Sequence, residues 1–282
     1  MKVGIQLYSV RKTMAVDAVP TIRKVVETGY KYLEAANHHA DVDDGIGFGV
    51  PAEEMKKILD DTGAEVKSAH IFPFNDDMYR RVIEYNQKIG NDTIVYPMEF
   101  FHDHDDALRI AERCQTLGKI ARSEGMKFLY HNHFHEFQVF DGETVLDTIM
   151  NNTDPDYVNL ELDTFWTMRA GLDPVEMIRH FGTRLKKLHQ KDMAWDTKTP
   201  VNMFELTGDS YIDMKKFGEV KCKDDFTEIG YGRMDIQKII DAANDLGTVD
   251  FVFLEQDESK LDELESIKKS MTGFKKYSGL EW

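Results

Sequence analysis

The sequence predicts an α/β fold, a (β/α)8 TIM barrel in which eight parallel strands alternate with helices. The chain has 282 residues. Such a barrel needs roughly 250 residues, so we expect one barrel domain over 1–282. One sequence pattern recurs along the chain: an amphipathic helical stretch, a glycine, and a short apolar run that ends in polar residues. It places the strands near 3–8, 31–36, 65–70, 92–97, 126–132, 157–162, 184–190 and 250–256.

Each element follows from local signals. Gly29, Gly63 and Gly247 each follow a helical pattern, and glycine ends a helix in the left-handed conformation without a Cβ clash. The apolar runs that follow show little alternation, which is typical of parallel strands covered on both faces. Asp173 and Pro174 supply an N-cap and a first helical residue.

The last interval between strands is longer than the others, so we expect a long loop region, 193–235, over the mouth of the barrel. A doubly wound open sheet is the alternative fold. It is disfavoured because the strand count is high and no GxGxxG motif follows the first strand.

Composition narrows the class of protein. The formal net charge is −16, and an acidic surface argues against a nucleic-acid partner. The two cysteines, Cys114 and Cys222, form no CxxC pair and suggest neither a disulfide framework nor a thiolate metal site. The N-terminus enters an apolar strand without a signal-peptide pattern, and no apolar run is long enough to cross a membrane. We therefore expect a cytoplasmic enzyme.

Polar side chains gather where the expected strands end, which is where barrels carry their active sites. A lone histidine there is more often a hydrogen-bonding loop residue than a ligand, but the same bias at most strand ends indicates a site. The residues at these ends are Tyr8, Glu34, His38, His39, His70, Glu99, His131, His133, His135, Glu136, Asp163, His189, Lys191, Glu255 and Asp257.

For two of these residues the sequence allows two different roles. Asp163 could ligate a metal or simply cap the next helix. Glu255 ends an apolar run and needs a partner, which could be a metal or Lys191. Three carboxylates and one imidazole from four strands would form a hard, mostly oxygen site. Such a site suits Mn²⁺, Mg²⁺ or Co²⁺, with Zn²⁺ also compatible.

Six sequence motifs, in their order along the chain, resemble those of the sugar phosphate isomerase/epimerase branch of the xylose-isomerase-like barrel superfamily. They are KVGIQLYSVR, YHNHFHEF, ELDTFW, KKLHQKD, GYGRMD and FLEQD. The resemblance implies one divalent metal, Mn²⁺ first, held by Glu136, Asp163, His189 and Glu255. The strand-five position is open, because His131 or His133 could replace Glu136 there.

The resemblance also implies a chemistry. A metal-bound sugar would lose a proton next to its carbonyl group, giving an enediolate that the metal stabilises. Glu136 and Glu255 would act as the two bases, with Lys191 stabilising the oxyanion and His133 binding a hydroxyl or moving a proton. Expected substrate-binding residues are Trp166, His70, Glu34 and Arg233.

Other activities are compatible with the same motifs. Related barrels eliminate or hydrolyse 3-keto sugars or glycosides, or dehydrate inososes, and share the first proton removal. An abasic-site endonuclease is disfavoured by the acidic charge, and a non-catalytic sugar-binding barrel by the full ligand set. The partner is a small sugar or sugar derivative, and a phosphate on it could contact Arg11, Lys191 or Arg233. A homo-oligomer built on 193–235 is a further possibility.

Overall fold

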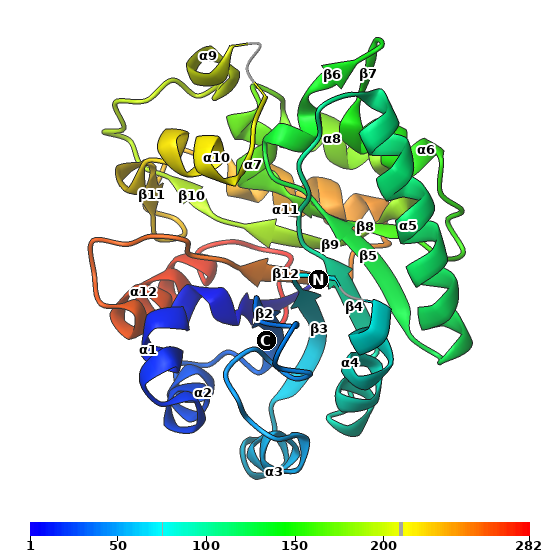
Figure 1. The fold of residues 1–282 in the computed structure, drawn as a ribbon. Coiled ribbons are helices and arrows are strands. Elements are labelled where there is room, and N and C mark those ends of the chain that lie inside the picture. The colour runs from blue at the N-terminus through cyan, green and yellow to red at the C-terminus, as the bar shows by residue number, and fades with distance from the viewer. Residues whose placement is uncertain (75, 209–210) are drawn as a thin grey trace.

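Eight parallel strands close into a barrel in this computed structural model, which describes residues 1–74, 76–208 and 211–282 (Figure 1). The order around the barrel is β1-β12-β9-β8-β5-β4-β3-β2. The predicted fold class is confirmed. The barrel strands are β1 (Lys2–Gln6), β2 (Tyr32–Asn37), β3 (Glu65–Ile71), β4 (Thr93–Tyr96), β5 (Lys127–His131), β8 (Asn159–Asp163), β9 (Leu185–Gln190) and β12 (Phe251–Leu254).

Helices surround the strands on the outside of the barrel (Figure 1). Gly63 and Gly247 adopt the left-handed conformation at the ends of two of them, and the Asp173 side chain caps a third by accepting from the Val175 N–H. The helices are α1 (Arg11–Val16), α2 (Ala18–Glu27), α3 (Ala52–Thr62), α4 (Asp76–Lys88), α5 (His104–Ser123), α6 (Val145–Asn151), α7 (Thr164–Arg169), α8 (Pro174–Phe181), α11 (Ile236–Leu246) and α12 (Glu263–Phe274).

The first and last strands close the barrel. β1 pairs in parallel with β12, and Gly4 lies opposite Phe253. A Cβ on Gly4 would lie 2.5 Å from the Phe253 ring and 2.7 Å from the Tyr32 carbonyl oxygen. Only glycine fits at this position, because the phenyl ring of Phe253 fills the space.

The region 193–235, expected as a long loop region, contains short helices and a short strand among its described residues. It contains α9 (Phe204–Thr207), α10 (Met214–Val220) and β11 (Phe226–Thr227), which pairs antiparallel with β10 (Asp192–Met193). A hairpin formed by β6 (Val139–Phe140) and β7 (Glu143–Thr144) follows β5. Short 3-10 turns lie at Leu7–Val10, His135–Phe137, Gly182–Arg184 and Lys223–Asp225. The long interval therefore combines short elements with the loops that connect them.

The outer core is apolar, but the barrel also contains a buried polar layer. Its members come from five strands and are all nearly or fully buried: Gln6, Glu34, Ser68, Glu161 and Lys187. Buried polar groups need hydrogen-bond partners, so this layer constrains how the strand ends above it are held. Among the described residues, no helix has the length and apolar character required to traverse a bilayer.

Candidate active site

Four side chains converge at the carboxyl ends of four barrel strands. His131, Asp163 and His189 come from β5, β8 and β9, and Glu255 follows β12 directly. One potential ligand atom from each lies within 4.8 Å of those of the others, and all four residues are buried. We call these residues the ligand group.

His131 is oriented as a metal ligand. Its Nδ1 lies 3.0 Å from the Pro97 carbonyl oxygen, so Nδ1 carries the proton and donates it. Nε2 is buried without a hydrogen-bond partner among the described residues, 3.7 Å from an Asp163 carboxylate oxygen. Burial lowers the pKa of His131, which keeps its ring neutral. A backbone carbonyl that fixes one ring nitrogen and leaves the other free is the usual support of a ligating histidine.

His189 is held on both ring nitrogens. Nδ1 lies 3.0 Å from Glu255 Oε2, and Nε2 contacts Glu34 Oε2. Burial alone would lower the pKa of His189, but the surrounding carboxylates, led by Glu161, raise it well above its usual value. Glu34 is fixed in turn by Gln6 Nε2 at 2.9 Å and by the Ser68 hydroxyl. The histidine therefore has one orientation.

Asp163 caps the next helix, one of the two roles that the sequence left open, and it also belongs to the ligand group. One carboxylate oxygen accepts from the Trp166 backbone N–H at 2.7 Å and caps α7, while the other contacts the Lys191 ammonium group. Lys191 also contacts Glu255 and lies 3.6 Å from Asp257. Burial would lower the pKa of Lys191, but these carboxylates raise it. Lys191 is thus the counter-charge of the ligand group.

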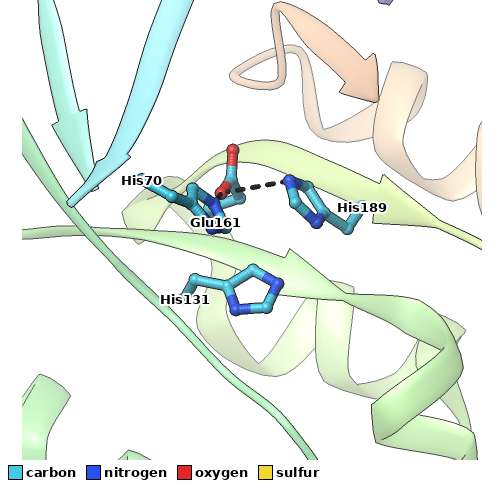
Figure 2. A group of neighbouring side chains, drawn as sticks. All are labelled: His70, His131, Glu161 and His189. Carbon is cyan, nitrogen blue, oxygen red and sulfur yellow. Dashed lines mark hydrogen bonds and ion pairs between the residues drawn. The ribbon is translucent and has the colours of Figure 1, made fainter. Parts of the chain in front are cut away.

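A second group of side chains shares His131 and His189 with the ligand group. It consists of His70, His131, Glu161 and His189, whose side chains point toward one another in Figure 2. Glu161 Oε2 is 2.7 Å from His70 Nε2 and 3.3 Å from His189 Nε2. Burial and the Glu34 carboxylate raise the pKa of Glu161 to about 8.

Sequence reasoning missed Glu161 as a site residue. The signal was present: it lies two residues before Asp163 in the same strand, and side chains two apart in a strand point to the same side.

Glu136, expected as the strand-five ligand, lies apart from the ligand group. β5 ends at His131, and Glu136 sits five residues later in a 3-10 turn. Its carboxylate accepts from the Tyr130 hydroxyl at 3.1 Å and the His133 backbone N–H at 2.8 Å, and burial raises its pKa to about 8. The structure therefore brings His131, the alternative left open by the sequence, into the strand-five position.

A cavity of about 290 Å³ opens onto the ligand group. His70, His131, His133 and Glu255 are in its lining. A larger open hollow of about 640 Å³ lies between residues 39–53 and α4, but none of the ligand group lines it. The smaller cavity is the candidate substrate site because it alone of these two contacts the candidate chemistry.

Of the four expected substrate-binding residues, one lines the cavity and three do not. His70 lines the cavity, whereas Glu34 is buried in the polar layer beneath it. Trp166 is buried behind His133 and Phe217, and Arg233 is exposed outside the cavity lining. The Phe and Tyr side chains in the cavity lining are instead Tyr8, Phe72 and Phe217, the last from α10.

The ligand group fits a divalent ion. Two imidazoles and two carboxylates from four strands make a mixed nitrogen and oxygen donor set, which suits Mn²⁺, Co²⁺ or Zn²⁺. The free Nε2 of His131 supports this fit, because a buried ring nitrogen without a partner is costly unless something binds it.

Comparison with known proteins gives matches over most of the chain. A family model described as xylose isomerase-like TIM barrel matches residues 22–277. The inosose dehydratase of Clostridium tetani is 30% identical over 163 residues, which cover 57% of this chain and 51% of the relative. The chain spans about half the length of these curated relatives.

Two solved structures share the fold. A sugar phosphate isomerase/epimerase from Parabacteroides distasonis superposes with a TM-score of 0.77 at 22% identity, covering 99% of this chain and 95% of that one. The 3-keto-D-glucoside 4-epimerase of E. coli superposes with a TM-score of 0.67 at 15% identity, covering 98% and 99%.

Proposed function

Because this chain belongs to the xylose isomerase-like TIM-barrel family, we propose that it is a divalent-metal-dependent enzyme acting on a sugar-like carbonyl compound. Its first step is removal of a proton from the carbon next to the carbonyl group. The observation that carries this proposal is the convergence of His131, Asp163, His189 and Glu255 beside a cavity. Mn²⁺ is the proposed ion.

The bound ion would polarise the substrate carbonyl and so acidify the neighbouring C–H bond. The chain supplies the rest. His133 lines the cavity, burial lowers its pKa well below the usual value, and its Nδ1 has no hydrogen-bond partner within the described residues. A neutral imidazole with a free nitrogen can accept the proton, so His133 is the proposed base. Lys191 would offset negative charge developing on the substrate.

Elimination is the outcome that we favour after this step. The proton passes to His133, the C–O bond at the next carbon breaks, and the departing hydroxide takes that proton from protonated His133 and leaves as water. Glu136 is buried against Tyr130 and the His133 backbone, which argues against the pair of opposed glutamates expected of an epimerase. The inosose dehydratase relatives support the same outcome.

Isomerisation or epimerisation is the second candidate. His133 and Glu255 both line the cavity, so two different groups could remove and return a proton. The product separates the two candidates: an isomer of the substrate, or a dehydrated compound with loss of water.

Metal content of the purified protein tests the proposal. We expect about one divalent ion per chain in the native protein, and loss of it in Asp163→Ala, His189→Ala and His131→Ala. Glu136→Gln is the matched control and should keep the ion. Exchange of substrate hydrogen for deuterium, screened with ketoses, inososes and 3-keto glycosides and added Mn²⁺, then identifies the reaction. A native protein that binds none of Mn²⁺, Co²⁺, Mg²⁺ and Zn²⁺ contradicts the mechanism.

A further inference from the structure

Cationic groups around the candidate substrate cavity are already paired. Lys221 lines the cavity and contacts Asp257 Oδ2 at 2.7 Å. Lys191 contacts Asp163 and Glu255 and lies 3.6 Å from Asp257. Two ammonium groups therefore face three carboxylates. A bound divalent ion would add positive charge here, but two of these carboxylates belong to the ligand group that would hold it.

The other basic residues near the mouth are unavailable too. Arg11 contacts Glu258 at 3.0 Å and the Asp257 carbonyl oxygen at 2.6 Å, with its guanidinium group stacked 4.1 Å from the Tyr8 ring centroid. Arg233 is exposed and does not line the cavity. Within residues 1–74, 76–208 and 211–282, Lys221 is the only lysine or arginine in the cavity lining. The three remaining positions of the sequence, Asn75, Asp209 and Ser210, carry no basic side chain.

The backbone position where barrels often bind phosphate is also filled. That position is formed by the loops after the seventh and eighth strands. Asp192 follows β9, the seventh barrel strand, and its carboxylate accepts from the backbone N–H groups of Gly230, Gly232 and Met234 at 3.0, 2.9 and 3.2 Å. These N–H groups could otherwise cradle an external anion. The chain's own carboxylate occupies their place.

The cavity lining offers buried acceptors to the hydroxyl groups of a ligand. Asp257 lines the cavity, is 5% exposed, and its Oδ1 has no hydrogen-bond partner among the described residues. His133, also in the lining, has an unpartnered ring nitrogen, Nδ1. Hydroxyl groups can donate to such acceptors, whereas a phosphate dianion only accepts and would lie against carboxylates.

We infer that the substrate carries no phosphate and is an uncharged polyhydroxylated carbonyl compound, such as a free keto sugar, an inosose or a keto glycoside. This inference rests on the proposed function for the choice of a sugar. Phe72, Met98 and Phe217 in the lining cover the apolar face of the ring, and Asp257 Oδ1, which lies 3.6 Å from the Lys191 ammonium group, accepts from one hydroxyl group.

Titration of the full-length protein with inorganic phosphate, followed by calorimetry, tests the inference directly. We expect no saturable binding by the native protein with a Kd below about 1 mM. Asp257→Asn frees Lys221 of its carboxylate partner, so phosphate binding should strengthen at least about tenfold. Asp196→Asn is the control, because Asp196 is 78% exposed and lies outside the cavity lining. Native binding with a Kd well below about 1 mM that is lost in Lys221→Met overturns the inference.

Deuterium exchange with matched pairs, for example D-fructose and D-fructose 6-phosphate, gives a second readout. Faster exchange of unphosphorylated members supports the inference, and faster exchange of phosphorylated members overturns it. If no sugar exchanges at all, the proposed function fails, while the phosphate titration still decides the charge preference of the cavity.

Discussion

Glu34 illustrates how a residue can matter without reaching the substrate. The sequence placed it at a strand end and suggested substrate binding. In the structure it is fully buried and holds His189 Nε2, while Gln6 and Ser68 fix its own position. A carboxylate that holds the distal nitrogen of a ligating histidine orients the ring and raises its basicity. Glu34 thus leaves His189 Nδ1 directed at Glu255 and the ligand group.

We therefore predict that Glu34→Gln weakens Mn²⁺ binding by about 10- to 100-fold, because glutamine keeps the shape but loses the charge that holds His189. Calorimetric titration with Mn²⁺ measures this change. Glu27→Gln, on the exposed side of α2, is the matched control and should bind Mn²⁺ like the native protein. Equal affinities in both variants would mean that His189 does not depend on Glu34.

Glu136 gives a prediction about pH. Burial raises the pKa of its carboxyl group to about 8, above the value of roughly 4.3 in an unfolded chain. A raised folded-state pKa means that the folded protein favours the protonated form. Stability from this group is present below about pH 4 and is lost as the pH rises through about 8.

Glu136→Gln removes this dependence. The free energy of unfolding of the native protein relative to the variant should fall by a few kcal/mol between about pH 5 and 9, since each pKa unit corresponds to about 1.4 kcal/mol. Urea unfolding of both proteins across this range measures it, and groups that titrate in both cancel in the difference. A constant difference would show that hydrogen bonds from Tyr130 and the His133 backbone keep Glu136 ionised.

At the scale of elements, α10 is the part of the region 193–235 that shapes the cavity. Phe217 of this helix lies with its ring centroid 5.3 Å from that of His133 and 5.4 Å from that of Trp166. The C-cap residue of the same helix, Lys221, reaches Asp257 beyond β12. One apolar and one ionic contact thus fix α10 to opposite sides of the barrel mouth.

Removing the apolar contact should release the helix. We predict that Phe217→Ala lowers the free energy of unfolding by about 3 kcal/mol, because a buried aromatic side chain leaves a cavity behind. The variant should also be cut faster by protease between 199 and 225. Met214→Ala is the control on the same helix: Met214 is 51% exposed, so its loss should change stability by less than about 0.5 kcal/mol. Similar behaviour of the two variants would argue against Phe217 as the anchor.

The sequence predicted elements better than it predicted the geometry between them. Eight strands were expected within a few residues of their observed positions, since glycine-terminated helices and unbroken apolar runs are local signals. Asp163, His189 and Glu255 do meet, because the ends of parallel strands share one side of a barrel. The position of Glu136 could not be predicted, because it depends on a 3-10 turn that directs its carboxylate toward Tyr130.

The sequence named Glu34, but its contacts with Ser68 and the position of Glu161 in the buried polar layer could not be predicted, for a different reason. The members of this layer are fixed by contacts between β2, β3 and β8, which lie far apart in the chain. Strand alternation shows that Glu161 and Asp163 face the same side, but no local signal tells which glutamates share a proton or a histidine.

At the scale of the whole molecule, closure of the barrel depends on the contact between its first and last strands. We predict that Gly4→Val prevents folding or costs more than about 4 kcal/mol, because its Cβ would lie 2.5 Å from the Phe253 ring. Circular dichroism during thermal unfolding measures the loss. Gly218→Ala is the control: a Cβ there has no heavy atom within 4 Å, and alanine in α10 should stabilise by up to about 1 kcal/mol. A Gly4→Val barrel of native stability would contradict the role assigned to β1–β12 packing.

The presence of His131 rather than a glutamate in the ligand group also sets the charge of the centre during turnover. A divalent ion bound here would displace the proton from the His189 nitrogen that holds it, so Asp163 and Glu255 would offset its two positive charges and two neutral imidazoles would add none. The ammonium group of Lys191 would contribute one positive charge, and the Glu34 carboxylate behind His189 one negative charge. Transfer of one substrate proton to His133 makes the substrate an anion and the His133 ring a cation, so the total charge of the centre does not change. A third carboxylate ligand would make the centre more negative by one charge and would therefore destabilise the deprotonated substrate.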